Sequence, residues 1–407
     1  MTWVSLEQLP MTEVSERMAR LRDHVTRLCP DAGGILVFSR LAIYYLSGSW
    51  ANGMLYVPLS GDPVLLCRKG VERSRLDSPL THILEYKSYS QVPGLLHEVG
   101  VGLNNHLAVE MTGLSWSMGD LLRSKLPEVT FVSGDAALNW TRAVKTPWEL
   151  DKLRLAGQRH DQALNDTLPA LIRPGMTERE IALAVWDAFY THGHQGMMRM
   201  QNAGEEIFLG HVAAGDSGNY PSAFNGPLGL RGAHPVLPFL GYAGKVWQRH
   251  EPLALDCGFC LEGYHTDKTQ IYWAEEAVVP DEADRAHDFC VQLQEFLADR
   301  LVPGAKPSEL YRDCIRIVLQ NDLGEGFMGL GRNKVGFLGH GIGLAIDEWP
   351  VIAPSFDTPL EENMVLALEP KIGIPGLGMV GTENTFVVTP QGGQCLTGER
   401  FGPTFAA

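Results

Sequence analysis

Short apolar runs alternate with amphipathic segments over the first 145 residues of the chain. The amphipathic segments, with apolar side chains at helical spacing, cover residues 13–29 and 115–126. The short apolar runs cover residues 33–39, 52–69 (two runs on either side of Gly61-Asp62), 106–111 and 129–134. Helical periodicity predicts helices, and short apolar runs bounded by turn residues predict strands. The alternation therefore predicts an α/β domain whose sheet is mostly covered by helices.

A strong helix start follows this region. The segment Thr146–Glu149 combines a threonine N-cap, a proline at the first helical position and the acid of a capping box. It opens a helix predicted over residues 147–168. We place the domain boundary at this point, with an N-terminal domain of residues 1–145 and a second domain of residues 146–407.

Two helix joins in the second domain resemble each other. Residues 171–181 and 301–310 each contain an apolar pair, a Pro-Gly turn and a helix start that carries an acid. The Pro-Gly pairs begin at residues 174 and 303, which are 129 positions apart. Because helix–turn–helix joins often look alike, two interpretations stay open. The domain contains two similar halves, or the two turns are alike by coincidence.

Composition and charge limit the class of protein. A chain of 407 residues with 45% hydrophobic and 20% charged residues is typical of a soluble globular protein with more than one core. A formal net charge of −15 argues against a nucleic acid or an anionic membrane as partner, because both need a basic surface. The chain shows no apolar run of ~20 residues and no signal-peptide pattern at its start. We therefore expect a cytoplasmic protein.

The seven cysteines are an odd number scattered along the chain, which does not indicate a disulfide framework. Cys257 and Cys260 form a Cys-x-x-Cys pair in a predicted strand, where odd spacing sends the two side chains to opposite faces. The chain has no second pair of this kind to complete a zinc site. We interpret both cysteines as small buried side chains.

Acidic residues occur inside apolar strands of the second domain. Residues 253–273 are predicted to form a hairpin that turns at Glu262-Gly263 and carries Asp256 and Asp267 on its two arms. Aspartate is depleted in strands, so a pair on one hairpin calls for a compensating charge. Two solvated acids at a sheet edge are the alternative interpretation. The flanking apolar residues disfavour it.

Two further acids and one histidine repeat this anomaly. Glu369 lies in the apolar run 364–372, Glu383 directly precedes another run, and His340 is surrounded by glycines. Buried carboxylates without counter-charge would take up protons. Two divalent cations would balance four carboxylates, and a site with one imidazole suits Mn, Fe, Co or Zn. Two such ions can activate a shared water, which predicts metal-assisted hydrolysis.

These motifs resemble one known family. The matching stretches are Asp256-x-Gly258-x4-Gly263-Tyr264-x2-Asp267-x-Thr269, Gly339-His340-Gly341-x-Gly343, Leu368-Glu369-Pro370 and Glu383-Asn384-Thr385. In order and spacing they resemble the creatinase, prolidase and aminopeptidase P group, peptidase family M24. The resemblance covers nearly the whole chain. It implies a creatinase-like N-terminal α/β domain and a catalytic domain of the α+β "pita-bread" fold, built from two pseudo-symmetric halves.

The resemblance also implies roles for these residues. Asp256 would bind one metal ion, Asp267 and Glu383 would bridge two, and His340 with Glu369 would complete the second site. Glu369 would in addition transfer the proton of the attacking water. The implied cofactors are two divalent ions, manganese first and iron, cobalt or zinc as alternatives. Relatives of this type are commonly homodimers.

Three positions depart from the family pattern. Peptidases of the group carry a histidine seven residues beyond the metal histidine, and here that residue is Asp347. They carry a Pro-His pair before the first metal aspartate. Counting back from Asp256 without gaps places Phe239 there. His234, the nearest histidine, could bind substrate after a local shift, or it could be a hydrogen-bonded loop residue. They also carry an arginine before the final glutamate, where this chain has Gly381, so Asn384 is a candidate to orient that acid.

These departures bear on the substrate. A carboxylate only accepts hydrogen bonds, so Asp347 would make its side of the pocket anionic or act as a base, unless it caps a turn and faces away. Phe239 could shelter a cation.

Three functions follow from these residues. The first is cleavage of the amide bond next to proline in a dipeptide or short peptide, as in Xaa-Pro dipeptidases and aminopeptidases. The second is the chemistry of a creatinase, an ectoine hydrolase or a dimethylsulfoniopropionate lyase on a small cationic substrate. The third is a binding protein that has lost catalysis.

Overall fold

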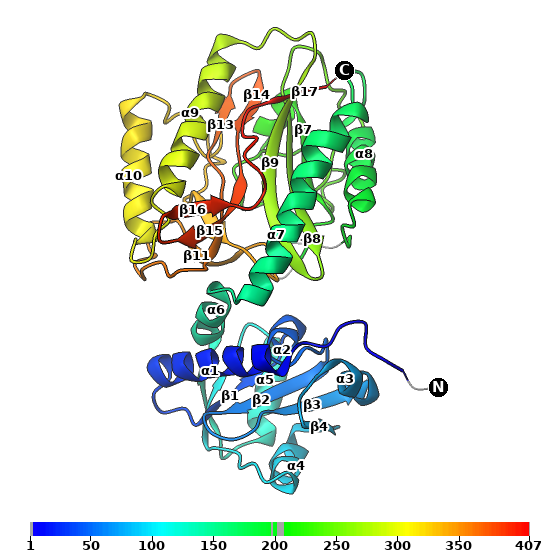
Figure 1. Cartoon of the computed structure of the whole chain (residues 1–407), viewed down its shortest axis with the longest axis vertical. Coiled ribbons are helices and arrows are strands. Elements are labelled where there is room, and N and C mark those ends of the chain that lie inside the picture. The colour runs from blue at the N-terminus through cyan, green and yellow to red at the C-terminus, as the bar shows by residue number, and fades with distance from the viewer. Residues whose placement is uncertain (1–2, 197, 202–206, 407) are drawn as a thin grey trace. The chain divides into compact units, whose positions relative to one another are not determined.

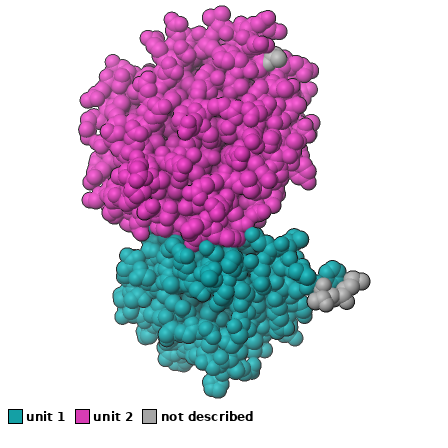
Figure 2. Space-filling model, in the orientation of Figure 1, with its two compact units in different colours: residues 1–142 teal, residues 143–407 magenta. Residues whose placement is uncertain are grey.

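The computed structural model describes residues 3–196, 198–201 and 207–406. It contains two compact units, Met1–Arg142 and Ala143–Ala407, which are coloured separately in Figure 2. The units divide close to the capped helix start expected at Thr146. Both units mix helices and strands, as the sequence predicted (Figure 1). Within the described ranges, no helix is long and apolar enough to cross a membrane.

The N-terminal unit is a six-stranded sheet with helices packed against it (Figure 1). The strand order is β4-β3-β2-β1-β5-β6. The strands are β1 (Gly34–Val37), β2 (Asn52–Pro58), β3 (Val64–Lys69), β4 (His82–Glu85), β5 (His106–Val109) and β6 (Thr130–Ser133). The helices are α1 (Met11–Leu28), α2 (Arg40–Ser47), α3 (Val71–Asp77), α4 (Val92–Glu98), α5 (Trp116–Lys125) and α6 (Asp135–Ala143). All the elements predicted in this region are confirmed, whereas β4 and the helices α2, α3, α4 and α6 were not predicted.

Two pairs of helices flank the strands of the second unit (Figure 1). They are α7 (Pro147–Gln162) with α8 (Glu178–Thr191), and α9 (Asp281–Ala298) with α10 (Pro307–Gln320). Helix α7 packs on strands β8 (Leu253–Leu261) and β9 (Tyr264–Ala274). Helix α9 packs on β12 (Val365–Leu368), β13 (Lys371–Ile374) and β14 (Gly378–Gly381). The predicted capping box at Thr146 is confirmed, because its side chain accepts from the Glu149 N–H and the Glu149 carboxylate accepts from the Thr146 N–H. After Gln162 the helix continues as a π-helical turn and a 3₁₀ turn.

The strands of this unit form two larger sheets and one hairpin. The first sheet has the order β17-β9-β8-β7, from β7 (Gly210–Ala214), β8 (Leu253–Leu261), β9 (Tyr264–Ala274) and β17 (Thr404–Ala406). The second has the order β11-β10-β12-β15-β16, from β10 (Gly339–Gly341), β11 (Glu348–Val351), β12 (Val365–Leu368), β15 (Asn384–Thr389) and β16 (Gly392–Cys395). The hairpin joins β13 (Lys371–Ile374) to β14 (Gly378–Gly381).

The sequence echo extends from the helices into the strands. Phe208-Leu209-Gly210-His211 and Phe337-Leu338-Gly339-His340 are identical in sequence, and they are again 129 residues apart. In each half a Pro-Gly turn precedes a helix, and a Gly-His pair then begins strand β7 or β10. The repeat of both order and spacing favours two related halves over a coincidence. It also makes His211 the counterpart of His340.

The core of the second unit contains a buried histidine. His194 packs its ring against Phe189 and Phe259, with centroids 5.6 and 5.3 Å apart. Its Nδ1 accepts a hydrogen bond of 2.9 Å from the Cys260 N–H. Burial lowers the pKa of His194 to about 4, because the charged ring cannot be solvated there.

Acid is therefore expected to destabilise this core. An unfolded histidine titrates near pH 6.5 and the folded one near 4, so the unfolded chain binds more protons between these values. His194 should reduce the free energy of unfolding by up to about 1.4 kcal/mol per pH unit as the pH falls from 6.5 to 4. Urea unfolding of wild type and His194→Asn across this range measures the difference. Equal pH slopes for the two proteins would contradict the prediction.

Candidate metal centre

The two hairpin aspartates lie on one face of the first sheet. The predicted hairpin is confirmed, with its turn at Glu262-Gly263, where both residues have positive φ. Asp256 pairs with Thr269, and Asp267 pairs with Gly258. Because residues two apart on a strand share a face, Asp256 and Asp267 are diagonal neighbours.

Gly258 and β7 complete the surroundings of these aspartates. A Cβ at Gly258 would lie 1.8 Å from the end of the flexible Met198 side chain, so a larger residue there would have to displace that side chain. On the other side of Asp256, His211 of β7 is its direct partner in the strand pairing. His211 therefore lies beside the first aspartate, which the sequence did not predict.

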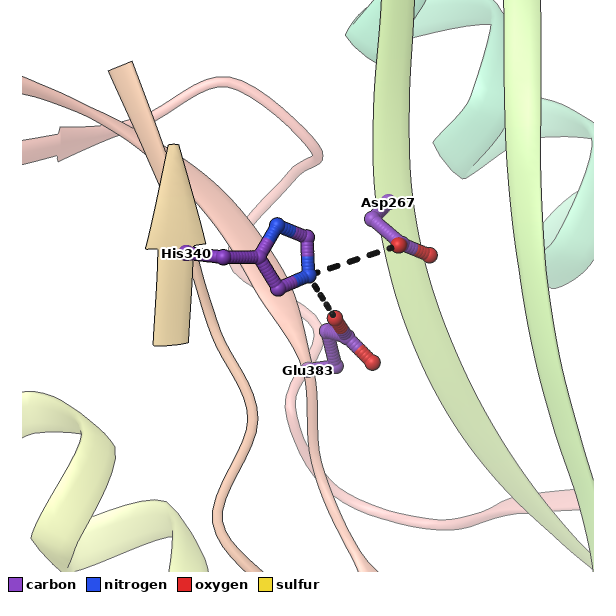
Figure 3. A group of neighbouring side chains, drawn as sticks. All are labelled: Asp267, His340 and Glu383. Carbon is purple, nitrogen blue, oxygen red and sulfur yellow. Dashed lines mark ion pairs between the residues drawn. The ribbon is translucent and has the colours of Figure 1, made fainter. Parts of the chain in front are cut away.

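The second sheet brings His340, Glu369 and Glu383 to the same place. His340 lies in β10, Glu369 follows β12, and Glu383 precedes β15. The His340 Nε2 atom is 3.7 Å from Glu369 Oε1, 3.8 Å from Glu383 Oε1 and 4.0 Å from Asp267 Oδ2. Figure 3 shows this nitrogen pointing between Asp267 and Glu383. The acids and the histidine singled out in the sequence thus meet in one cluster.

The orientation of the His340 ring suits a metal ligand. Its Nδ1 is 3.1 Å from the Gly341 carbonyl oxygen, which only accepts hydrogen bonds, so Nδ1 carries the proton. The lone pair of Nε2 is then directed at the carboxylates. A ligating histidine is commonly fixed in this way by a hydrogen bond from its other nitrogen.

A lysine that the sequence analysis missed lies on the opposite side of the cluster. The Lys371 Nζ is 2.6 Å from Glu383 Oε2, 3.1 Å from Glu369 Oε2 and 3.4 Å from Asp256 Oδ2. The side chain is completely buried. The available signal was a charged residue inside the apolar run 364–374, directly after Glu369-Pro370.

Burial and charge shift the acids in different directions. Burial alone would raise the pKa of Asp256, but the Lys371 ammonium offsets it and holds that pKa below its ordinary value. Burial raises the pKa of Asp267 well above its ordinary value, and the neighbouring carboxylates raise it further. It also raises the pKa of Glu369 and Glu383 against the effect of Lys371. One ammonium therefore does not balance four carboxylates, and the cluster favours a further cation.

The donor set fits such a cation. One ligand atom from each of Asp267, His340 and Glu383 lies within 4.8 Å of the others, and Glu369 Oε1 adjoins the same histidine nitrogen. Carboxylate oxygens with one imidazole suit a divalent first-row transition ion. The fit is clear on the His340 side only, because on the other side Lys371 contacts the oxygens of Asp256, Glu369 and Glu383.

The cluster lies at a cavity of about 280 Å³. Besides the cluster residues, the described lining includes mainly apolar side chains: Met198, Met200, Ile207, Phe224, Phe337, Ile346, Trp349 and Val351. His211 also faces this cavity, and burial lowers its pKa to about 4, so the ring is neutral at ordinary pH. Among the described lining residues there is no lysine or arginine.

Asp347 is part of the cavity lining and does not face away from it. Its Oδ1 accepts a hydrogen bond of 2.7 Å from the Gln201 N–H. Burial raises the pKa of the Asp347 carboxyl, against the effects of that hydrogen bond and of His340. The next residue, Glu348, is anchored by the buried Lys145 ammonium at 3.2 Å, which fixes the backbone that carries Asp347.

His234 and Phe239 were the two residues considered for the substrate-binding position of the family's Pro-His pair, and the structure places both outside the described cavity lining. His234 is exposed on a turn, where its Nδ1 accepts from the Val236 N–H. Phe239 is buried behind His211 and Phe224, with ring centroids 6.0 Å from each. Neither is among the described residues that line the cavity, whereas Phe224 and the adjacent Asn225 are.

Glu383 is oriented by groups other than the one expected. Thr269 Oγ1 donates to its Oε2 at 3.0 Å, and Lys371 Nζ contacts the same oxygen. The Asn384 amide instead donates to Gln294 and Thr382, 3.0 Å away in each case. The suggestion that Asn384 replaces the missing arginine is therefore wrong. A lysine and a threonine hold this acid.

Family models match both units of the chain. Residues 151–390 match Metallopeptidase family M24, and residues 17–144 match the Creatinase/Prolidase N-terminal domain. The chain belongs to metallopeptidase family M24. Membership identifies this M24 protein as a metallohydrolase whose cofactor is a divalent metal, and it confirms the family predicted from the sequence motifs.

Named relatives agree with this family. The M24 chain is 26% identical over 366 residues to the Xaa-Pro dipeptidase of Pyrococcus furiosus, covering 89% of this chain and 92% of the relative. It is 29% identical over 291 residues to the Xaa-Pro dipeptidase of Lactobacillus helveticus, covering 71% and 70%.

Solved structures confirm the predicted fold. The Xaa-Pro dipeptidase from Bacillus anthracis superimposes with a TM-score of 0.78 at 21% identity, covering 96% of this M24 chain and 99% of that one. The X-Pro aminopeptidase from Thermotoga maritima gives a TM-score of 0.74 at 22% identity, covering 92% and 97%. A creatinase-like N-terminal domain followed by a pita-bread domain is therefore the fold of this M24 protein.

Loss of His340 should remove most of the stabilisation by metal. At a free ion concentration 100 times Kd, binding stabilises the folded state by about 2.7 kcal/mol, or roughly 5–10 °C in Tm for a unit of this size. His340→Ala removes the nitrogen ligand and should lose most of this shift. The exposed His250 provides the matched control, because His250→Ala should keep it. Thermal unfolding with and without Mn²⁺ measures both, and an unchanged shift in His340→Ala would contradict the assignment.

Proposed function

We propose that the protein is a metal-dependent hydrolase that cleaves the amide bond preceding proline in a dipeptide or short peptide. The observation that carries the proposal is the cluster of His340 with Asp267, Glu369 and Glu383 at the cavity of an M24 chain. The Xaa-Pro dipeptidase relatives that align with most of the chain support the same substrate class. Because the metal-binding acids are retained, an enzyme is favoured over a binding protein that has lost catalysis.

The residues of this site have two roles, binding the ion and transferring a proton. Asp267, His340, Glu369 and Glu383 hold the ion, which when bound supplies a Lewis acid that activates water and polarises the scissile carbonyl. Glu369 is the residue placed to accept the proton of the attacking water and to pass it to the proline nitrogen as the amide bond breaks. Burial raises the pKa of the Glu369 carboxyl in the metal-free site, whereas a bound ion would lower it.

The cavity suits a small substrate. A volume of about 280 Å³ is at the lower end for ligand pockets, which typically measure about 300–1,000 Å³. Phe224, Phe337 and Ile346 provide an apolar surface against which a proline ring can pack. The ion, with manganese as the first expectation, the homodimer and the cytoplasmic location remain predictions from the sequence.

A second candidate is hydrolysis, or proton abstraction by Asp347, on a small cationic molecule. It is favoured by the charge of the cavity, where Asp347 adds to the metal-binding acids and the described lining holds no lysine or arginine, whereas the charge of Glu348 is already paired with Lys145. The free carboxylate of a dipeptide would find no counter-charge among these residues. A cationic group would be attracted instead. The two candidates therefore differ in the charge that the substrate carries opposite Asp347.

Substrates that differ only in charge separate the two candidates. The Mn²⁺-loaded protein should release proline from Ala-Pro, and chelation should abolish the reaction. Ala-Pro amide, which lacks the terminal carboxylate, should be cleaved at least roughly tenfold faster, since a like-charge contact costs between about 1 kcal/mol in bulk water and about 4 kcal/mol near a protein surface, and about 1.4 kcal/mol is a factor of ten. Chromatographic product analysis measures the rates. If only a small cationic amide or sulfonium compound reacts, the second candidate replaces the first, and no reaction with any substrate contradicts both.

Removing the charge of Asp347 should reverse the expected preference for cationic substrates over substrates with a free carboxylate. Asp347→Asn or Asp347→His should raise kcat/KM for Ala-Pro by roughly tenfold and lower it for a cationic substrate, because the like charge is lost. Glu361→Gln changes an exposed acid outside the described cavity lining and serves as the control. Steady-state kinetics of wild type, the two Asp347 variants and Glu361→Gln measures kcat/KM for both substrate types. Unchanged kcat/KM for both substrate types in the Asp347 variants would show that this residue has no role in selectivity.

A further inference from the structure

Lys371 occupies a position at which a second cation would be expected. Its ammonium contacts three of the four clustered acids, with Glu383 Oε2 the nearest at 2.6 Å. The side chain is entirely buried at the first residue of β13. Among the described residues, no other lysine or arginine forms an ion pair with these acids.

The two glutamates divide their oxygens between two cation positions. Oε1 of Glu369 and Oε1 of Glu383 lie 3.7 and 3.8 Å from His340 Nε2. Oε2 of the same residues lies 3.1 and 2.6 Å from Lys371 Nζ. Each carboxylate thus presents one oxygen to the metal site on the His340 side and the other to the ammonium. Asp267 belongs to the first side and Asp256 to the second.

A metal ion and the ammonium cannot both use the second side. Carboxylate oxygens bind first-row divalent ions at about 2.0–2.2 Å. An ion at that distance from Glu383 Oε2, Glu369 Oε2 and Asp256 Oδ2 would lie where the Lys371 nitrogen already contacts the same three oxygens. The two cations would also repel each other in a site from which water is largely excluded.

The backbone around Lys371 holds its side chain beside the acids. Lys371 pairs with Gly381 across the β13–β14 hairpin. Gly381 has φ +137°, and a Cβ there would lie 2.5 Å from the Pro370 carbonyl oxygen and 2.6 Å from Lys371 Cα. The glycine, which stands where related peptidases are expected to have arginine, therefore allows the hairpin to close tightly behind the lysine. One basic residue replaces another at this acid pair.

We propose that this centre holds one divalent ion, bound by Asp267, His340, Glu369 and Glu383, and that the Lys371 ammonium is a permanent second cation in place of a second ion. This inference rests on the proposed metal-dependent function, and it replaces the sequence prediction of two ions. The lysine also holds Asp256 and the two glutamates in position whether or not the ion is bound.

His211 supplies the means to test this idea. It lies opposite Asp256 in the β7–β8 pairing and is the counterpart of His340 in the internal repeat. Neither ring nitrogen has a hydrogen-bond partner among the described residues, and the side chain is buried at the cavity. If Lys371 is removed, Asp256, His211, Glu369 and Glu383 would form a second set of ligands that resembles the first.

Counting bound ions tests the proposal. Each protein is stripped with chelator, loaded with Mn²⁺, freed of excess ion and analysed by elemental mass spectrometry and by isothermal titration. We expect one ion per chain in wild type, two in Lys371→Ala and one in Lys371→Ala/His211→Ala. Electron paramagnetic resonance gives an independent readout, because an isolated Mn²⁺ and a coupled pair have different spectra. Lys268→Ala removes another buried lysine of this unit and should keep one ion.

The outcomes separate this inference from the proposed function. Two ions in wild type would overturn the role of Lys371 and leave the metal-dependent hydrolase intact. No ion in wild type would overturn both. One ion in both wild type and a folded Lys371→Ala would show that the lysine does not exclude the second ion. Should Lys371→Ala not fold, the wild-type count and its resonance spectrum alone decide between one ion and two.

Discussion

The structure of the catalytic unit depends on compensating four carboxylates that are buried together. Asp256, Asp267, Glu369 and Glu383 come from two sheets and meet at one cavity. Their mutual repulsion and loss of hydration would be very costly without cations. The Lys371 ammonium supplies part of the positive charge from within the chain. The remainder must come from protons or from an ion on the His340 side.

This division of charge gives the centre two unlike sides. On one side, His340 and Asp267 present lone pairs that require an added cation. On the other, Asp256 is already paired with Lys371 and stays ionised, since the ammonium holds its pKa below the ordinary value. The two glutamates connect the sides, one oxygen to each. The two halves of the internal repeat therefore keep the same backbone arrangement, with His211 and His340 at corresponding strand positions. They differ in the cation beside the acids, which is the Lys371 ammonium on one side and an added ion on the other.

Much of the fold and most of the cluster could be predicted because their signals are local. The hairpin of residues 253–273 combines apolar runs with a tight turn, and an acid on each arm is unusual enough to indicate a site. The capping box at Thr146 fixed the start of α7. His340 was identifiable because glycines surround it and because its neighbours match a family motif.

The rest required spatial information. Lys371 follows Glu369-Pro370 in an apolar run. Only the structure of the β13–β14 hairpin shows that the Lys371 ammonium contacts the acids. His211 becomes meaningful through its pairing with Asp256. Counting from Asp256 to Phe239 did not reach the cavity because most of the connection between β7 and β8 is irregular, and Phe224 with Asn225 lines the cavity instead.

A crystal structure of the Mn²⁺-soaked protein with anomalous scattering data tests most directly whether the centre holds one ion beside Lys371. We predict a single anomalous peak among Asp267, His340, Glu369 and Glu383, with Lys371 Nζ still within hydrogen-bond distance of Glu383. Two peaks about 3.5–4 Å apart, as in dinuclear sites, with the lysine displaced from the acids, would contradict it.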